Sequence, residues 1–168
     1  MEEEYQDIVD EDDNIVSSDK RQNIWDKGLE SRTRSVNLFI IDENQNILLP
    51  VRSKNKKKWP LCYDFSCGEN VISGETYEQA ILRGIKEELG INNLIPIEIS
   101  YLTPKIGATN FLKIYKISVK SNEFKPKITD HKEIDHFEWK TIEDIRKLMY
   151  SKPNRFKNGY QFVFEKSF

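Results

Sequence analysis

The stretch of sequence that decides the fold runs from Gly74 to Ile91 and reads GETYEQAILRGIKEELGI. Apolar residues recur in it at the three- and four-residue spacing of one helical face; they are Tyr77, Ala80, Ile81, Ile85 and Leu89. Thr76 precedes this face and Gln79 follows three residues later, which is the signature of a capping box, while Gly90 is a typical helix terminator. The pattern predicts an amphipathic helix from Thr76 to Leu89.

The charged residues of this helix point to a metal site. Positions 84, 87 and 88 stand in an i, i+3, i+4 relation, so carboxylates at all three would converge on one face and share a hard cation. Here Glu87 and Glu88 are present, but position 84 is glycine. Arg83 could fix the Glu87 carboxylate, and Glu75 could pair with the arginine in turn. A bound Mg²⁺ or Mn²⁺ would polarise phosphate oxygens and lower the pKa of an attacking water, which is diphosphate chemistry.

The spacing resembles the Nudix box, whose pattern is G-x5-E-x7-R-E-U-x-E-E-x-G-U, with U an aliphatic residue. Seven of its nine specified positions match, and they are Glu75, Arg83, Ile85, Glu87, Glu88, Gly90 and Ile91. Glu69 stands at the motif glycine and Gly84 at the first glutamate of the Arg-Glu pair. In the family that glutamate is often a metal ligand or the general base, and glycine can be neither. Glu69 and the later Glu133 are therefore the two candidates for the general base.

The resemblance extends to the isopentenyl-diphosphate-isomerase-like branch of the Nudix superfamily. The matching features are 7–12 and 14–16, Arg52 with Lys56 and Lys57 before Trp59-Pro60, Cys67-Gly68, and 133–139. By this resemblance Arg52, Lys56 and Arg83 would hold the substrate diphosphate, and Cys67 would contact the substrate and transfer a proton. On its own, the sequence favours a buried structural role for the Cys67 thiol, unless a basic neighbour such as Arg83 lowers its pKa. The isomerase also needs a histidine-rich metal site, and its counterparts here are Trp25, Ser31 and Glu69. The isomerase reaction is thus disfavoured, although the diphosphate-binding loop is retained.

The remaining segments alternate between strands and helices. We expect a hairpin over residues 5–16, strands at 36–41, 47–51, 63–66, 95–102, 111–119 and 134–139, a second helix opening at Thr141, and a packed tail over 153–164 that could form a third helix. Interleaved strands and helices favour layers around a mixed sheet. The expected fold class is α/β, the α/β/α sandwich of the Nudix fold.

Composition limits the remaining possibilities. At 168 residues and 38% hydrophobic content, the chain is expected to form a single Nudix domain over 1–168, with a hairpin and lead-in over 1–30 and the box loop and helix over 68–91. Two cysteines are too few for a disulfide framework, and the acidic start (Met1 to Glu4) lacks the features of a signal peptide, so we expect a cytoplasmic protein without a membrane anchor. The basic loop 52–58 is too short and too poor in aromatics to favour nucleic acid. The sequence leaves the oligomeric state open.

Three functions follow from these observations. The first is a metal-dependent Nudix hydrolase that cleaves a diphosphate linked to another moiety, with a small-molecule substrate of nucleotide type. Because position 84 has no carboxylate, the second is an inactive Nudix domain that binds a nucleotide or a protein partner. The third is an isopentenyl-diphosphate isomerase with a rebuilt metal site.

Overall fold

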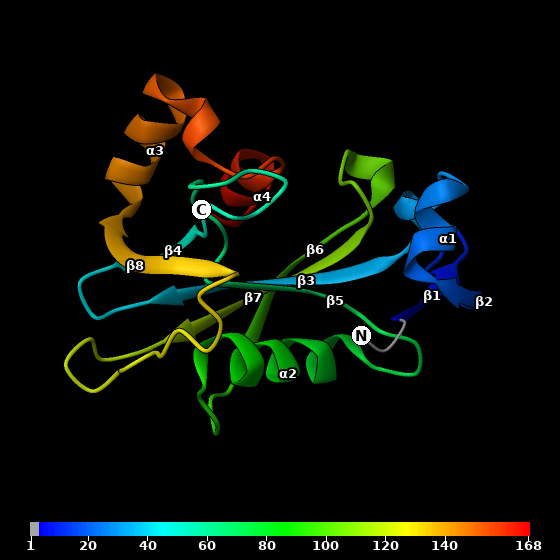
Figure 1. Ribbon diagram of the computed structural model, residues 1–168, viewed down its shortest axis with the longest axis horizontal. Helices are drawn as coiled ribbons and strands as arrows, with labels where there is room; N and C mark the ends of the chain where they lie inside the picture. The colour runs from blue at the N-terminus through cyan, green and yellow to red at the C-terminus, as the bar shows by residue number, and fades with distance from the viewer. Residues whose placement is uncertain (1–3) are drawn as a thin grey trace.

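The computed structural model describes residues 4–168 and places a mixed six-stranded sheet between helices (Figure 1). The order along the sheet is β6-β7-β3-β4-β8, and β5 pairs with β3. The strands are β3 (Arg34–Ile41), β4 (Asn46–Arg52), β5 (Cys67–Asn70), β6 (Ile97–Leu102), β7 (Phe111–Ser118) and β8 (Ile134–Thr141). Five of the six predicted core strands are confirmed within a few residues, whereas the predicted strand at 63–66 is replaced by β5, which begins at Cys67.

Strand β3 organises the sheet. It runs parallel to β7 along its full length and antiparallel to β5, but it meets β4 at a single ladder pair, Ile41 with Ile47. Asp42 holds the turn between β3 and β4 by accepting hydrogen bonds from the backbone of Asn44 and Asn46. Beyond that turn the two strands diverge, and β4 pairs with β8 instead. The divergence leaves the end of the sheet open beside β5.

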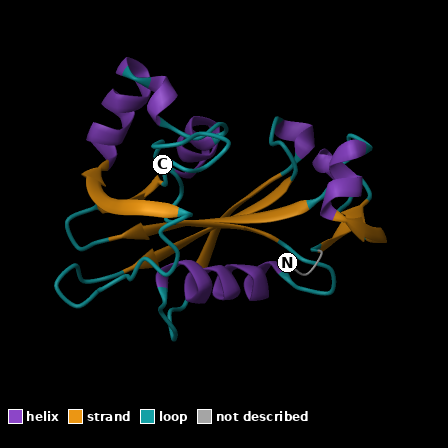
Figure 2. Ribbon diagram, in the orientation of Figure 1, coloured by secondary structure: helices purple, strands orange, loops and turns teal. Residues whose placement is uncertain are grey.

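The helices cover both faces of the sheet (Figure 2). Helix α2 (Tyr77–Leu89) lies on one face, and α3 (Ile142–Ser151) and α4 (Tyr160–Ser167) lie on the other. Thr76 and Gln79 form the predicted capping box of α2, and Gly90 ends the helix in the left-handed conformation at φ 65°. Thr141 caps α3 as predicted, and the tail forms the predicted third helix. The α/β/α sandwich around a mixed sheet is therefore confirmed.

Alternation along β3 divides the core between the two faces. Val36, Leu38 and Ile40 pack toward α2, together with Cys67 of β5. Phe39 and Ile41 pack on the opposite face, where the aromatic rings of Phe65, Phe156, Tyr160 and Phe164 gather. Both clusters are fully buried at their centres.

The N-terminal segment folds against the sheet rather than extending as a tail. The predicted hairpin is present as β1 (Tyr5–Val9) and β2 (Ile15–Lys20), followed by α1 (Arg21–Asp26), which the polar sequence did not predict. Asp13, at the tip of the hairpin, accepts hydrogen bonds from Arg34, Tyr77 and Tyr101 at 2.6, 2.9 and 2.8 Å. The acidic start at residues 1–3, on which the prediction about export depends, lies outside the described residues. Within residues 4–168, no helix is long and apolar enough to cross a membrane.

Candidate active site

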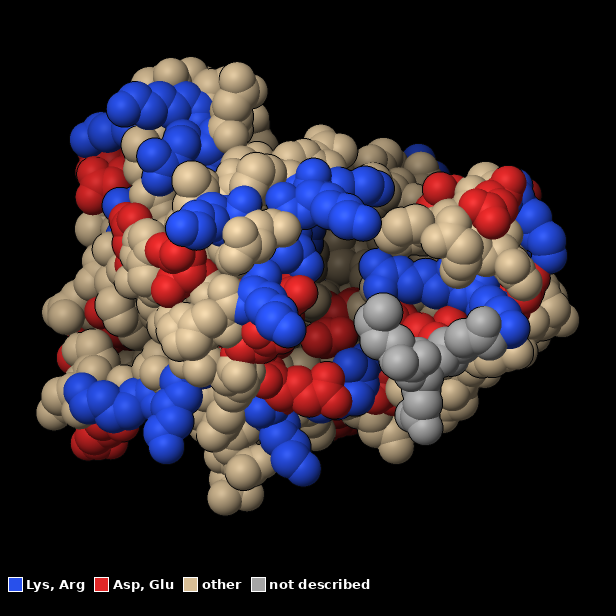
Figure 3. Space-filling view, in the orientation of Figure 1, with Lys and Arg blue, Asp and Glu red and all other residues tan. Residues whose placement is uncertain are grey.

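A cleft of about 1160 Å³ opens where the sheet splits. Its wall includes α1, β3, β4, the loop 55–59, β5, the end of α2 and the segment 157–159. The charged residues lining it are Arg21, Arg52, Lys56, Lys57, Lys58, Lys132 and Lys157, and Asp64, Glu69, Glu88 and Glu133. On this face Lys and Arg side chains gather above a central hollow, and Asp and Glu side chains gather below it (Figure 3). One side of the cleft is therefore cationic, with Asp64 and Glu133 paired to its arginine and lysine side chains, and the other side carries Glu69 and Glu88.

The Glu69 side chain occupies the space that a Cβ atom at position 84 would take, and this space is open because residue 84 is glycine. The register of β3 and β5 points Cys67 and Glu69 toward α2, where Gly84 lies. A Cβ atom at position 84 would lie 2.4 Å from Glu69 Cγ and 2.8 Å from Cys67 Sγ. Real Cβ atoms essentially never approach other atoms so closely. Gly84 gives the helix no carboxylate at this position, but it leaves space for the Glu69 carboxylate of β5 in the same place.

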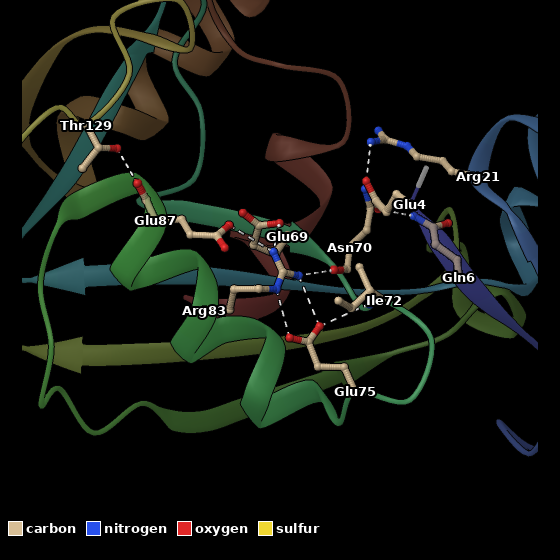
Figure 4. A network of polar contacts seen from close by, with 10 residues as sticks. All are labelled: Glu4, Gln6, Arg21, Glu69, Asn70, Ile72, Glu75, Arg83, Glu87 and Thr129. Atoms are coloured by element: carbon tan, nitrogen blue, oxygen red, sulfur yellow. Dashed lines mark hydrogen bonds and ion pairs between the residues drawn. The ribbon is translucent and has the colours of Figure 1, made fainter. Parts of the chain in front are cut away.

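Arg83 holds three carboxylates around this point (Figure 4). Its guanidinium donates to both oxygens of Glu75 at 2.9 and 3.2 Å, to Glu69 at 3.1 Å, to Glu87 at 3.4 Å and to the carbonyl of Asn70 at 2.9 Å. These contacts engage all five N–H groups of the side chain. Arg83 therefore orders its neighbours, as predicted, and has no free donor for the diphosphate contact that the isomerase resemblance implied.

Glu88 lies in the cleft beside Glu69. Burial, and then the charge of Glu69, raise the pKa of Glu88 to about 8, while a hydrogen bond from the Cys67 thiol opposes that rise. Burial also raises the pKa of Glu69. Two carboxylates that repel each other in a partly desolvated site favour a bound proton or a cation between them. The geometry is consistent with a cation site formed from β5 and α2 together.

Glu87 forms the predicted ion pair with Arg83, but its carboxylate lies outside the cleft. Its side chain is 59% exposed, its carboxylate is turned to Arg83, and it is absent from the lining of the cleft. Its backbone carbonyl accepts a hydrogen bond from Thr129. Helix α2 therefore presents one motif carboxylate to the cleft and keeps the other on the outer side of Arg83.

Cys67 does not reach the cleft. Its side chain is 0% exposed, and burial followed by the neighbouring charge of Glu88 raises the pKa of its thiol well above the ordinary value. A reactive cysteine needs an accessible thiol with a depressed pKa. The prediction of substrate contact by Cys67 is not supported, because the side chain packs between β5 and α2 beside Gly84, in the position of a buried structural thiol.

The basic loop lies along the opposite side of the cleft. Arg52 donates to Asp64 at 2.6 Å and to the backbone carbonyls of Trp59 and Lys58, which fixes the loop. Two of its five N–H groups have no acceptor within residues 4–168. Lys56 forms an ion pair with Glu133. Both predicted phosphate-binding residues therefore line the cleft, with Glu133 on the cationic rim and not beside Glu88.

The family model for the NUDIX domain matches residues 31–160. The chain belongs to the Nudix family. An uncharacterised Nudix hydrolase of Nostoc sp. is 37% identical over 137 residues, which cover 80% of this chain and 79% of the relative. Isopentenyl-diphosphate Delta-isomerase 2 of Photorhabdus laumondii is 26% identical over 148 residues, covering 88% and 82%. The crystal structure of DR0079 from Deinococcus radiodurans is 27% identical, with a TM-score of 0.87 over 98% of this chain and 99% of that one.

Two Nudix-box departures in this family member now have one structural explanation. Glu69 and Gly84 are in contact, so the carboxylate absent from the helix is matched by one on the strand that faces it. The place of Glu69 in the loop before the helix makes it a candidate from the sequence, but no motif predicts that Glu69 approaches Gly84. The sequence does not point to Asp64 and Lys157, which line the same cleft, because their contact joins residues 93 positions apart, from 64 to 157.

Proposed function

We propose that this Nudix protein is a metal-dependent hydrolase of a diphosphate linked to another moiety, with the missing motif carboxylate supplied by Glu69. The observation that carries the proposal is the contact between Gly84 and Glu69, which brings the Glu69 carboxylate to the helix face beside Glu88. A merely degenerate box gives no reason for an acidic residue to fill the vacated space. The proposed substrate is small and of nucleotide type, and the exposed rings of Trp25 and Trp59 offer apolar surface for its non-phosphate part.

The residues present fit Mg²⁺ or Mn²⁺. Within residues 4–168, no three His, Cys, Asp or Glu side chains are gathered as a complete cage. Mg²⁺ commonly binds one or two protein carboxylates and completes its shell with waters and substrate phosphates. Glu88 would hold the cation, and Glu69 beside it would accept the proton of the attacking water. A bound cation would offset the burial and the Glu69 charge that raise the pKa of Glu88. When bound, the ion would polarise the phosphoryl oxygens and the attacking water.

Phosphate binding and proton transfer would fall to different residues of the cleft. Arg52 and Lys56 would bind phosphate oxygens from the opposite side of the cleft. Arg83 occupies Oε2 of Glu69, and among the described residues no group donates a hydrogen bond to its Oε1. A carboxylate with one free oxygen and a raised pKa can accept a proton from water. Glu69 is therefore the better candidate for the general base than Glu133, whose carboxylate is paired with Lys56.

The test is phosphate or nucleoside monophosphate release across a panel of nucleoside diphosphate derivatives, with Mg²⁺ and with Mn²⁺. Glu69→Gln and Glu88→Gln are each expected to lower turnover by about 100-fold or more, the usual effect of losing a general base or a metal ligand. Glu78→Gln is the matched control, because Glu78 is an exposed glutamate of α2, the helix that carries Glu88. A wild-type protein that binds these compounds with no turnover under either metal would instead support the non-catalytic binding function.

The isomerase function is less well supported. The buried Cys67 thiol, with its raised pKa, is unsuited to proton transfer at a substrate in the cleft. His131 and His136 are both exposed and absent from the cleft lining. Proton exchange on isopentenyl diphosphate that survives Cys67→Ala would remove Cys67 from any role in that chemistry. The two free cysteines support residence in a reducing compartment such as the cytoplasm.

A further inference from the structure

Asp64 pairs with two cations at the side of the cleft, Arg52 from β4 and Lys157 from the C-terminal segment. Its Oδ2 lies 2.6 Å from Arg52 Nη1, and its Oδ1 lies 3.2 Å from Lys157 Nζ. All three side chains line the cleft, with exposed fractions of 14% for Arg52, 14% for Asp64 and 28% for Lys157. One carboxylate thus faces two cations, so the cluster of Arg52, Asp64 and Lys157 carries a net positive charge toward the cleft.

Backbone pairing holds Lys157 in this position. Tyr63 donates its N–H to the carbonyl of Arg155 at 2.7 Å, and Lys157 donates its N–H to the carbonyl of Tyr63 at 3.0 Å. The Phe156 ring between them packs on Tyr63 at 5.3 Å, inside the core. The Lys157 ammonium also lies 5.9 Å from the centre of the Phe65 ring. The position of Lys157 is therefore set by the core, unlike that of the lysines on the loop 54–58.

Lys157 lies between the two sides of the cleft. Besides its contact with Asp64, its charge reaches Glu88, where it opposes the effect of burial on the carboxyl pKa. An ammonium group has three donors, and among the described residues one of them is used, on Asp64. Two donors remain for a ligand at the point where the carboxylate side and the cationic side meet. An anion whose oxygens contact a cation on one side and ammonium donors on the other matches this arrangement.

We propose that Lys157 is a phosphate-binding residue of the cleft, which contacts a phosphoryl oxygen of the diphosphate between Arg52 and Glu88. The proposal rests on the proposed function for its substrate class, and it adds a cation from the C-terminal segment to the two from the basic loop. Asp64 holds the Arg52 and Lys157 side chains in place. The alternative is that the Asp64–Lys157 pair only ties the C-terminal segment to the sheet.

The experiment is calorimetric binding of methylenediphosphonate, a diphosphate that cannot be hydrolysed at its bridge, in the presence of Mg²⁺. Lys157→Met keeps the unbranched stem near Phe65 and removes the charge, and Lys157→Arg keeps the charge. We expect Lys157→Met to weaken binding by about 10- to 100-fold, the range for losing a hydrogen bond to a charged group, and Lys157→Arg to retain most of the affinity. Lys152→Met is the matched control, because Lys152 is an exposed lysine of the same C-terminal segment.

Thermal unfolding of the same variants separates binding from folding. A Lys157→Met protein that is folded at the assay temperature and binds the probe within twofold of wild type would overturn the proposal, as would equal loss in Lys157→Arg and Lys157→Met. The hydrolase proposal fails separately. If the wild type binds methylenediphosphonate through Lys157 but hydrolyses no diphosphate, the subsite stands and the catalytic function is wrong.

Discussion

Gly84→Ala tests whether the glycine in α2 is required by packing. At an ordinary helical position, replacing glycine by alanine stabilises the helix by about 1 kcal/mol. At position 84 the new Cβ would lie 2.4 Å from Glu69 Cγ and 2.8 Å from Cys67 Sγ, and Cys67 is fully buried. Inserting a methyl group into a packed site costs about 1–3 kcal/mol. The cost of the inserted methyl group exceeds the gain in helix propensity, so we expect Gly84→Ala to lower the free energy of unfolding by up to about 2 kcal/mol. Helix propensity alone would raise it.

Urea unfolding of a double-mutant cycle measures this effect. Glu69→Ala removes the Cγ atom nearest to the new methyl group, so the cost of Gly84→Ala should be smaller in that background by about 0.5 kcal/mol or more, the usual coupling between residues in contact. If Gly84→Ala raises the free energy of unfolding by about 1 kcal/mol in both backgrounds, as helix propensity alone would, the glycine is not needed for space and the structural explanation of the box is wrong.

Three further changes test other parts of the account. The Tyr160 hydroxyl is the one buried side-chain polar atom in residues 4–168 without a hydrogen-bond partner, so Tyr160→Phe should leave the free energy of unfolding unchanged or raise it by about 1 kcal/mol or more. Urea unfolding measures this, and a loss above about 1 kcal/mol would reveal a hidden partner of the hydroxyl. Asp13→Asn should lower the free energy of unfolding by about 2 kcal/mol, since the Asp13 carboxylate accepts three side-chain hydrogen bonds, from Arg34, Tyr77 and Tyr101. A change below about 0.5 kcal/mol would show that other contacts, such as that of Ser73 with Asp7, hold the hairpin in place. Burial raises the folded-state pKa of Glu88 to about 8, so the contribution of Glu88 to the free energy of unfolding in chelator should be largest below the ordinary glutamate pKa of 4.5 and fall by up to about 1.4 kcal/mol per pH unit as the pH rises from there to about 8. The difference between wild type and Glu88→Gln in urea unfolding separates this contribution from those of Asp19 and Glu138, whose pKa values are lowered, and a difference that stays constant with pH would contradict the raised pKa of Glu88.

The sequence predicts the helices and most of the sheet because their signals are local. The capping residues of α2 and α3 and the left-handed Gly90 are short-range features, and the structure confirms them. The strand predicted at 63–66 is displaced to Cys67–Asn70 because that segment pairs with β3, whose position depends on the whole sheet. Helix α1 has the single buried side chain Ile24, so its sequence carries almost no amphipathic signal.

The site is less predictable because it is built from long-range contacts. The pairing of Glu75 with Arg83 follows from spacing along a helix and its entry loop. The burial of Cys67, the outward position of Glu87 and the approach of Lys157 to Asp64 depend on how β5 and the C-terminal segment meet α2. A motif gives the residue types, but it does not give which carboxylate faces the cleft.

The most direct test of the central claim exchanges the residues at positions 69 and 84. Mg²⁺-dependent hydrolysis of the best substrate would be measured for Glu69→Gly, for Gly84→Glu and for the double variant. Glu69→Gly removes the carboxylate, and Gly84→Glu adds one into occupied space, so each single variant should lose activity. The double variant restores a carboxylate to the helix with space beside it, and we predict that it regains activity over both singles. Full activity in Glu69→Gly, or a gain of activity in Gly84→Glu alone, would contradict the account.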